Sequence, residues 1–223
     1  MKTTLQIVVI LAMAINANPQ GTFQNLDFEQ ANPVYFPGGA ATTASALPYW
    51  TVLVGGVQQR IIAVNSPTYG ASSVTLLSPG VLPTGFGVFT PIDGNYSVLL
   101  ESFGSTATPS ISQTGVIPAG TQSLLFSTRP TAWGPINLMM GTQSVPYTEV
   151  ETGPNYIVYG ANISAWAGQS VELTFSDPYA AGSWELDDIS FSPNAVPEPN
   201  SFALIGIGGL FFAGYRRFAP KRA

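Results

Sequence analysis

Residues 184–192 read WELDDISFS and alternate apolar with polar side chains, as a half-buried β-strand does. Trp184 and Leu186 share one face of such a strand, whereas Ile189 has the opposite parity. One extra residue at 187–188 returns Ile189 to the apolar face, which predicts a β-bulge there. This stretch decides the fold class, because an alternating, bulged segment is typical of an antiparallel sheet.

Similar short runs recur through the chain, separated by turns rich in Gly, Pro, Asn and Ser, and no helical repeat accompanies them. The further candidate strands are TFQNLDFE (22–29), YWTVLVG (49–55), RIIAVN (60–65), YSVLLES (96–102), SISQTGVI (110–117), QSLLFSTR (122–129), INLMMG (136–141), NYIVYGANI (155–163) and SVELTFSD (170–177). Segments of this length and spacing predict an all-β domain over residues 18–195, an antiparallel β-sandwich or jelly roll.

The composition excludes several classes of function. The 223 residues contain no Cys and no His. Disulfides, thiolate nucleophiles and thiolate metal sites are therefore excluded, and the commonest general base at neutral pH is missing. Residues 18–196 carry two basic and eleven acidic side chains, a net charge of −9. A body this acidic repels phosphate backbones, so nucleic acid is not an expected partner.

The N-terminal stretch MKTTLQIVVILAMAINA has the layout of a secretory signal peptide. It combines Lys2, an apolar segment over 5–15, and small residues at Ala14 and Ala17, after which cleavage is expected. The alternative is a buried first strand or helix. Because the apolar segment is short for a membrane span, residues 1–17 predict export.

The C-terminal stretch contains a second apolar segment. PEP at 197–199 is followed by FALIGIGGLFFAGY at 202–215 and then by Arg216 and Arg217. A helix over the apolar residues reaches about 21 Å, against a hydrocarbon thickness of about 30 Å. Extended to 201–215 and flanked by arginines that reach the interface, it predicts a short transmembrane helix with its basic tail in the cytoplasm and the body outside.

This order of elements resembles the PEP-CTERM protein-sorting signal of Gram-negative bacteria, over residues 196–223 only. The residues that carry the resemblance are Pro197, Glu198, Pro199, Arg216 and Arg217. The resemblance implies recognition by a membrane-embedded exosortase, processing near the Pro-Glu-Pro motif, and a frequent link with exopolysaccharide and biofilm. The alternative is an ordinary C-terminal tail anchor.

The body resembles the galactose-binding-domain-like sandwiches of carbohydrate-binding modules and exported bacterial proteins. The matching stretches are NLDFE (25–29), PYW (48–50), SISQTGVIPAGTQSLLFS (110–127), NISAWAGQSVELTF (162–175) and WELDDISFS (184–192). These are strand and turn patterns, so the resemblance bears on fold more than on function.

The first and last candidate strands both carry carboxylates, and Asp187 and Asp188 are adjacent at the predicted bulge. The resemblance implies that these two strands share a structural ion site, and Ca²⁺ prefers carboxylate and carbonyl oxygen ligands. Glu29 and Asp188 are the leading candidate ligands, with Asp27 and Asp187 as further ones. The alternative is that these are solvated carboxylates at a sheet edge. Calcium is the only cofactor that the sequence suggests.

Exposed aromatic rings stack on the C–H faces of sugars, which makes tryptophans the candidate glycan contacts. Trp133 lies in the turn-rich stretch RPTAWGPI beside Arg129, and these two are the candidate carbohydrate-binding residues. An equally good interpretation is that Trp133 anchors its loop. Trp50, Trp166 and Trp184 occur in alternating or turn-closing contexts, where a role in the core is expected.

An enzyme built from this chain would have to use carboxylates, because His and Cys are absent. Glu185, Asp187 and Asp188 are close in sequence, but the sequence gives no sign of a groove around them. The expected function is therefore that of a non-enzymatic envelope or extracellular-matrix protein, exported, sorted by an exosortase, and anchored in the membrane transiently or stably. The alternative is a dedicated carbohydrate-binding module that recognises a polysaccharide.

Overall fold

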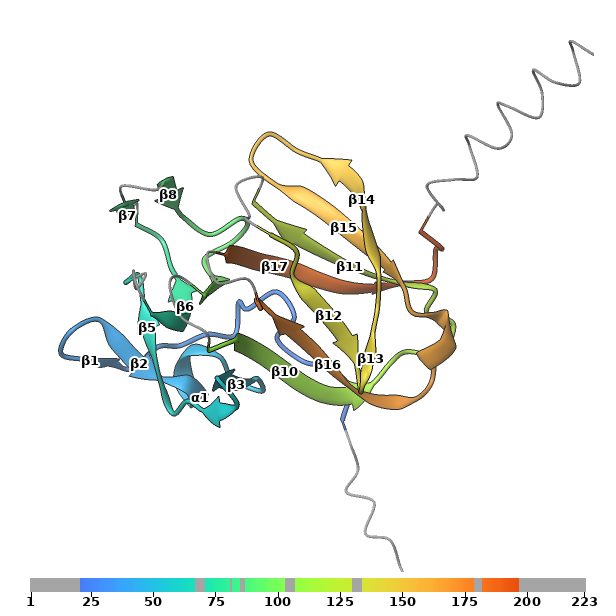
Figure 1. The fold of residues 1–223 in the computed structure, drawn as a ribbon, viewed down its shortest axis with the longest axis horizontal. Coiled ribbons are helices and arrows are strands. Elements are labelled where there is room, and N and C mark those ends of the chain that lie inside the picture. Colours follow the sequence, from blue (N-terminus) through green and yellow to red (C-terminus); the bar gives the residue numbers. More distant parts are fainter. Residues whose placement is uncertain are drawn as a thin grey trace, which may run out of the picture.

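The computed structural model describes residues 21–66, 71–80, 82–84, 87–102, 107–129, 134–178 and 182–196. The predicted signal peptide (1–17) and the predicted transmembrane segment (201–215) lie outside these ranges. Within the described ranges, no helix is long and apolar enough to cross a membrane. The body is a β-sandwich of two large, mainly antiparallel sheets, which confirms the predicted fold class (Figure 1).

The larger layer is a nine-stranded sheet. In spatial order its strands are β1 (Tyr35–Phe36), β2 (Ala40–Thr42), β5 (Ile61–Val64), β6 (Ser72–Leu77), β9 (Ser97–Ser102), β17 (Ser183–Ser192), β11 (Ser123–Thr128), β15 (Ile157–Asn162) and β14 (Tyr147–Thr152). Neighbours are antiparallel except β5 and β6, which run parallel. The last strand of the chain, β17, thus lies in the middle of the sheet between β9 and β11.

The second layer is a six-stranded sheet. Its strands, in spatial order, are β13 (Gln143–Ser144), β12 (Asn137–Met140), β16 (Ser170–Ser176), β10 (Pro109–Val116), β3 (Thr51–Val54) and β4 (Val57–Gln58). A separate hairpin joins β7 (Leu82–Thr84) to β8 (Gly87–Phe89). The two short helices are α1 (Thr43–Ala46) and a 3₁₀ turn (Ser164–Trp166).

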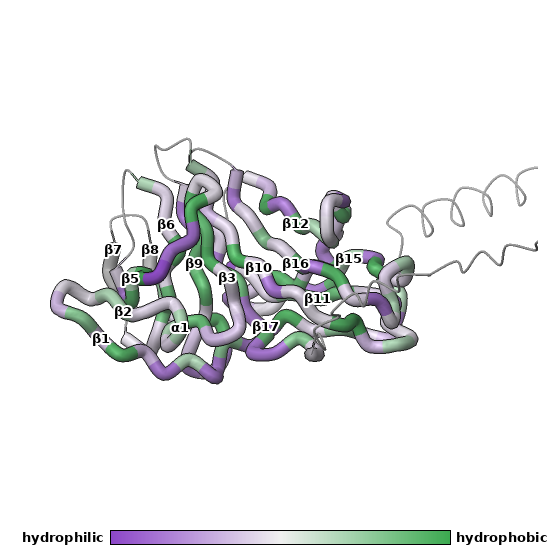
Figure 2. Tube along the Cα trace, turned by 90° about the horizontal axis from the view of Figure 1, so that it is seen from below, coloured by the Kyte–Doolittle hydropathy of each residue, from purple (hydrophilic) through white to green (hydrophobic). Residues whose placement is uncertain are grey.

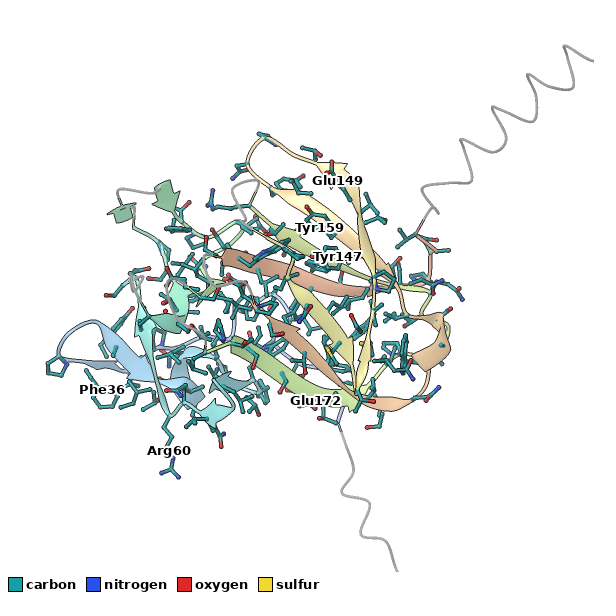
Figure 3. The ribbon with its side chains drawn as sticks, in the orientation of Figure 1. Phe36, Arg60, Tyr147, Glu149, Tyr159 and Glu172 are labelled. Atoms are coloured by element: carbon teal, nitrogen blue, oxygen red, sulfur yellow. The ribbon has the colours of Figure 1, made fainter. Side chains whose placement is uncertain are left out.

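The core lies between the layers and is centred on an aromatic cluster. Phe126 of β11 is fully buried, and its ring lies 5.2 Å from Phe175 of β16 in the opposite sheet. Tyr147 and Tyr159, from β14 and β15, lie 5.4 and 5.7 Å from the same ring (Figure 3). Offset and edge-to-face contacts of this kind add to the stabilisation that burial provides.

The centre of the nine-stranded sheet is buried on both faces. All six residues of β9 are buried, and β9 is largely hydrophobic (Figure 2). Val98 and Leu100 point into the core, so Ser97, Leu99 and Glu101 point to the outer face. Outer faces of sandwiches are usually solvated. Because these residues are buried, other parts of the chain must cover the outer face of β9.

The prediction of a first strand at 22–29 is wrong. Apart from one bridge between Thr22 and Val116, these residues form turns that close one end of the sandwich. Asn25 and Phe28 adopt φ of +52° and +58°, which no extended strand allows. Phe28 is fully buried, and its ring lies 5.7 Å from that of Trp50.

Strand β6, whose alternating Val74 and Leu76 are buried, was not among the predicted strands.

Two of the tryptophans that were expected in the core lie there. Trp50 and Trp184 are 5% and 3% exposed, which confirms their predicted place in the core. Trp166 is partly buried against it. The Nε1 of Trp50 donates to the carbonyl oxygen of Asn25 at 2.9 Å, so this ring fixes the closing loop.

Candidate functional site

The bulge predicted at residues 187–188 is present in β17. The pairing register of β17 with β11 shifts between Leu125 and Ser127. Asp188 has φ of +48°, which is uncommon for a residue other than glycine. As a result Asp187 stays buried while Asp188 is exposed to solvent.

Asp187 is hydrogen-bonded to the start of β9 and to the segment that precedes it. Its Oδ2 accepts hydrogen bonds from the Ser97 hydroxyl at 2.7 Å and from the Asp93 amide at 3.2 Å, and its Oδ1 accepts from the Asp188 amide at 2.8 Å. These bonds favour the charged carboxylate, but burial outweighs them and raises the pKa of Asp187 to about 7. Asp187 therefore takes up a proton near neutral pH.

Glu29 also forms hydrogen bonds with the segment that precedes β9. Its Oε1 accepts from the amides of Asn95 and Tyr96 at 2.7 and 2.8 Å, and its Oε2 accepts from the Asn95 side chain at 3.1 Å. The approach is close: a Cβ on Gly94 would lie 2.5 Å from Oε1, and Gly94 has φ of +56°. Glu29 and Asp187 together hold residues 93–97 against the first loop and the last strand.

The predicted calcium ligands are only partly brought together. Partial burial raises the pKa of Asp188, and the charges of Asp93, Asp27 and Glu29 raise it further, so these carboxylates influence one another. Among the described residues, however, no group of three or more Asp or Glu side chains is arranged to hold a metal ion. Asp188 is exposed, whereas Glu29 and Asp187 already accept N–H bonds. The calcium site remains a prediction.

An ion pair lies beside these carboxylates on the outer face of β17. The Nε of Arg129 is 2.5 Å from Oε2 of Glu185. The Nη2 of Arg129 also donates to the carbonyl oxygen of Thr90 and, at 2.6 Å, to the Thr90 hydroxyl. The candidate sugar contact Arg129 thus already binds the segment that covers the sheet.

Glu185 is buried, with 2% of its surface exposed. Burial raises its pKa to about 7 in spite of the neighbouring Arg129 guanidinium, which lowers it. Its Oε1 has no hydrogen-bond partner among the described residues. A buried acceptor without a partner is costly when charged, so the protonated form of the carboxyl group dominates below pH 7.

Glu185 and Asp187 point the same way from one strand, about 7 Å apart along the backbone. Two carboxyl groups at such a separation, with raised pKa values, are what a glycosidase uses. Both are almost completely buried, however, and are bonded to Arg129 and Ser97. In this arrangement Asp187 binds segment 90–97 directly, and Glu185 binds it through Arg129.

Several predicted site residues lie outside the residues that the structure describes. Trp133 is one of them, so its exposure and its relation to Arg129 remain predictions. The five residues of the sorting motif also lie there: Pro197, Glu198, Pro199, Arg216 and Arg217. The sequence analysis did not identify Ser97 and Thr90 as site residues; Ser97 was placed only in the candidate strand 96–102.

The comparisons with known proteins bear mainly on the C-terminus. Residues 195–217 match the family model described as the PEP-CTERM protein-sorting motif. The chain therefore carries this motif, which marks an exported protein sorted to the cell surface. None of the curated proteins matches the chain.

Solved structures with some likeness include carbohydrate-binding modules. TmCBM61 in complex with β-1,4-galactotriose has a TM-score of 0.39 and 17% identity, covering 78% of this chain and 98% of that chain. The family 11 module from Clostridium thermocellum, in complex with a β-1,3-1,4-mixed-linked tetrasaccharide, has a TM-score of 0.34 and 8% identity, covering 72% and 97%. These scores are low, so no ligand is inferred from them.

Proposed function

We propose that this chain is a non-enzymatic envelope or extracellular-matrix protein that an exosortase sorts and processes, in association with exopolysaccharide and biofilm. The observation that carries the proposal is the sorting motif at 195–217, which begins directly after the last strand of the sandwich. In the sequence, the motif thus begins three residues after the end of β17 at Ser192.

The charge distribution supports this arrangement. Arg216, Arg217, Lys221 and Arg222 follow the apolar segment, whereas the body before it has a net charge of −9. Basic residues stay on the cytoplasmic side of a membrane, which leaves the acidic body outside. Membrane anchoring lasts until the peptide bond near the motif is cleaved, with transfer of the new C-terminal acyl group to water or to an amine acceptor.

The test is the intact mass of the mature protein from cells with and without the cognate exosortase. We expect loss of the residues after the motif only in cells that contain the enzyme, and retention of the full C-terminus in the variant Glu198→Gln. Glu172→Gln, on the body strand β16, is the matched control and should be processed normally. A wild-type protein that still ends at Ala223 beside an active exosortase would refute the sorting role.

Carbohydrate binding is the second candidate function, and exposed aromatic rings favour it. Tyr35, Phe36 and Tyr49 are 58%, 42% and 56% exposed. Phe36 pairs with Ala40, which pairs with Ala63, so small side chains flank its ring on the sheet. Arg60 is exposed at the same end of the molecule (Figure 3). An exposed aromatic ring such as that of Phe36 suits stacking against a pyranose ring.

A polysaccharide pull-down with the full chain tests this second function. We expect Phe36→Ala to reduce retention at least fivefold, because one stacking face is lost. Val57→Ala, an exposed apolar residue without a ring, is the control and should bind as wild type does. Trp133→Ala tests the loop candidate in the same assay. If the wild-type protein binds no more polysaccharide than background, the proposed carbohydrate-binding function is refuted.

A further inference from the structure

The residues that connect β17 to the Pro-Glu-Pro sequence pack against the sandwich. After β17 the chain turns back over the sheet, where the Ser123 hydroxyl donates to the Asn194 carbonyl oxygen at 2.7 Å. The Asn194 amide donates to the Ser192 hydroxyl at 3.1 Å. Val196 is partly buried, although residues 193–195 before it are exposed.

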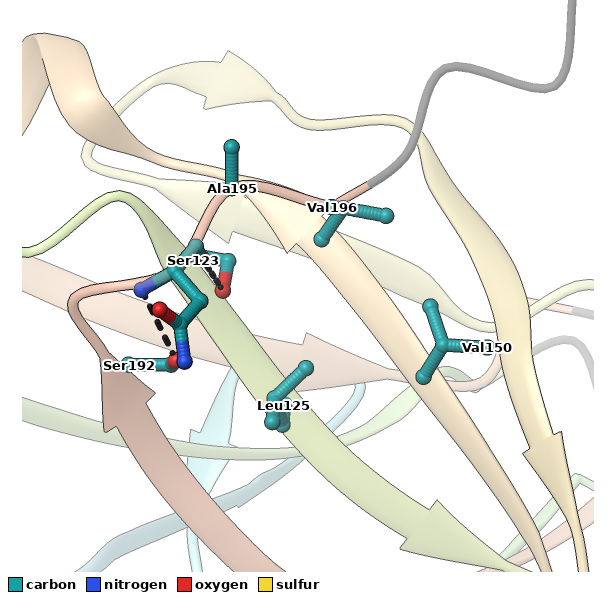
Figure 4. A pocket seen from close by; sticks show the side chains of 7 residues that line it. Ser123, Leu125, Val150, Ser192, Ala195 and Val196 are labelled. Atoms are coloured by element: carbon teal, nitrogen blue, oxygen red, sulfur yellow. Dashed lines mark hydrogen bonds between the residues drawn. The ribbon is translucent and has the colours of Figure 1, made fainter. Parts of the chain in front are cut away.

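Val196 packs into a shallow site formed by three strands (Figure 4). We call Ser123, Leu125, Val150 and Gly160 the tail seat. A cavity of about 200 Å³ lies between these strands and the tail and is lined by Ser123, Leu125, Val150 and the tail itself. Leu125 and Val150 are apolar residues on the outer side of the sheet, where alternation would predict polar ones.

Gly160 creates the space that this packing needs. A Cβ at Gly160 would lie 2.7 Å from Cγ2 of Val196, 3.0 Å from Cγ1 of Val150 and 3.2 Å from Cδ2 of Leu125. Real side chains do not approach so closely. The glycine therefore lets three side chains from distant parts of the sequence meet over one backbone position.

Val150 reaches the site through an irregularity in β14. The pairing of β14 with β15 shifts between Glu149 and Glu151, which makes Val150 the extra residue. A bulge of this kind re-aims a side chain. Figure 4 shows Val196 above Val150, while the Ala195 methyl group points away from the sheet. Val196 is thus the partly buried residue of the tail at this site, whereas Ala195 lines the cavity but is exposed.

We propose that the tail seat holds residues 194–196 and thereby keeps the sorting enzyme from the peptide bonds upstream of the motif. This inference rests on the proposed function. An enzyme that cleaves a chain must bind residues on both sides of the scissile bond in an extended form. Residues held by the sheet cannot enter such a site until the contacts of Val196 and the bond to Ser123 break. Processing is then confined to bonds downstream of Val196.

The deciding variant is Val196→Ser, which leaves the sheet unchanged and weakens the apolar contact. In cells that contain the cognate exosortase, we expect the full-length precursor to be processed about fivefold faster, since half-burial of one valine corresponds to roughly that factor. We also expect mature species that end upstream of residue 196, measured by intact mass. Gly160→Val, which fills the seat, should have the same effect, and Glu172→Gln, outside both the tail seat and the motif, is the control.

Methyl NOEs between Val196 and Val150 in the full-length protein report docking without any enzyme. We expect them in wild type and in Glu172→Gln, and their loss in Gly160→Val. Their absence in wild type would refute the tail seat. So would identical processing rates and C-termini in wild type and Val196→Ser. If wild type is never processed, the proposed sorting role fails instead, and the NOEs then show only a packed tail.

Discussion

Arg129 and Glu185 pair across neighbouring strands of the nine-stranded sheet, with 2.5 Å between Nε and Oε2 and with both side chains largely buried. The same guanidinium binds Thr90, so one residue joins the sheet to the segment that covers it. Removal of one partner of a buried ion pair costs far more than removal of a surface charge, because the other partner is left unpaired.

Arg129→Ala is expected to lower the free energy of unfolding by about 3 kcal/mol at pH 8. Without the guanidinium, which lowers its pKa, Glu185 must be either charged without its partner or protonated at a pH where the unfolded chain is not. At pH 5 the loss should be smaller, because the carboxyl group is then protonated. Denaturant unfolding at both pH values measures the difference. Arg60→Ala, at an exposed site, should change stability by less than about 0.5 kcal/mol. An equal loss at the two pH values would contradict the ion-pair account.

Stability should fall as the pH rises from about 4 to 7. In the folded protein burial raises the pKa of Glu185 and of Asp187 to about 7, from usual values of 4.5 and 3.8. The folded state therefore holds these protons where the unfolded state has lost them, and each deprotonation removes stability. If the two groups titrate independently, we expect a decrease of about 5 kcal/mol between pH 5 and 8, measured by denaturant unfolding.

The double variant Glu185→Gln, Asp187→Asn cannot titrate at either position and should show a nearly flat profile over this range. A variant of an exposed carboxyl group, Glu151→Gln, should keep the wild-type slope. If the double variant keeps that slope, other groups cause the pH dependence.

The calcium prediction can be tested by thermal melting. If Glu29, Asp27 and Asp188 share an ion, 1 mM Ca²⁺ should raise the Tm by several degrees and a chelator should reverse the change. Asp188→Asn should abolish the calcium effect with little change in the Tm without calcium, since Asp188 is exposed. Glu29→Gln should lower the Tm even without calcium, because it weakens three hydrogen bonds. A Tm that is insensitive to calcium and chelator would end the prediction.

Phe126→Ala is expected to lower the free energy of unfolding by about 3–5 kcal/mol, because it leaves a cavity between Phe175, Tyr147 and Tyr159. Phe191→Ala is the matched control. Phe191 is only partly buried beside Phe23, so its loss should be less than half as large. Similar losses at the two positions would show that the core is not centred on Phe126.

The fold class could be predicted because alternation survives in most strands of the body. The bulge in β17 was also visible, since the parity of the apolar residues changes between Leu186 and Ile189. The loop at 22–29 could not be recognised, because its alternation imitates a strand while its backbone enters the left-handed region at Asn25 and Phe28. No side-chain pattern reveals that choice.

The contacts of the carboxylates were harder to foresee. That Glu29 and Asp188 would influence each other followed from the expected meeting of the first and last segments. The hydrogen bonds of Glu29 to residues 95–96 depend on the conformation of a loop, which hydrophobic periodicity in the sequence does not predict. The pairing of Arg129 with Glu185 depends on the register of β11 against β17, which alternation alone leaves open.

The central position of β17 sets the order in which the molecule can form. Without this strand the nine-stranded sheet is two pieces, one ending at β9 and the other beginning at β11. A chain made from its N-terminus cannot join them until residue 192 has emerged, and pairings over such long sequence distances form slowly. The sandwich is thus completed only when its last strand is available, and the sorting motif lies just behind that strand. A chain truncated before β17 therefore lacks both the joined sheet and the sorting motif.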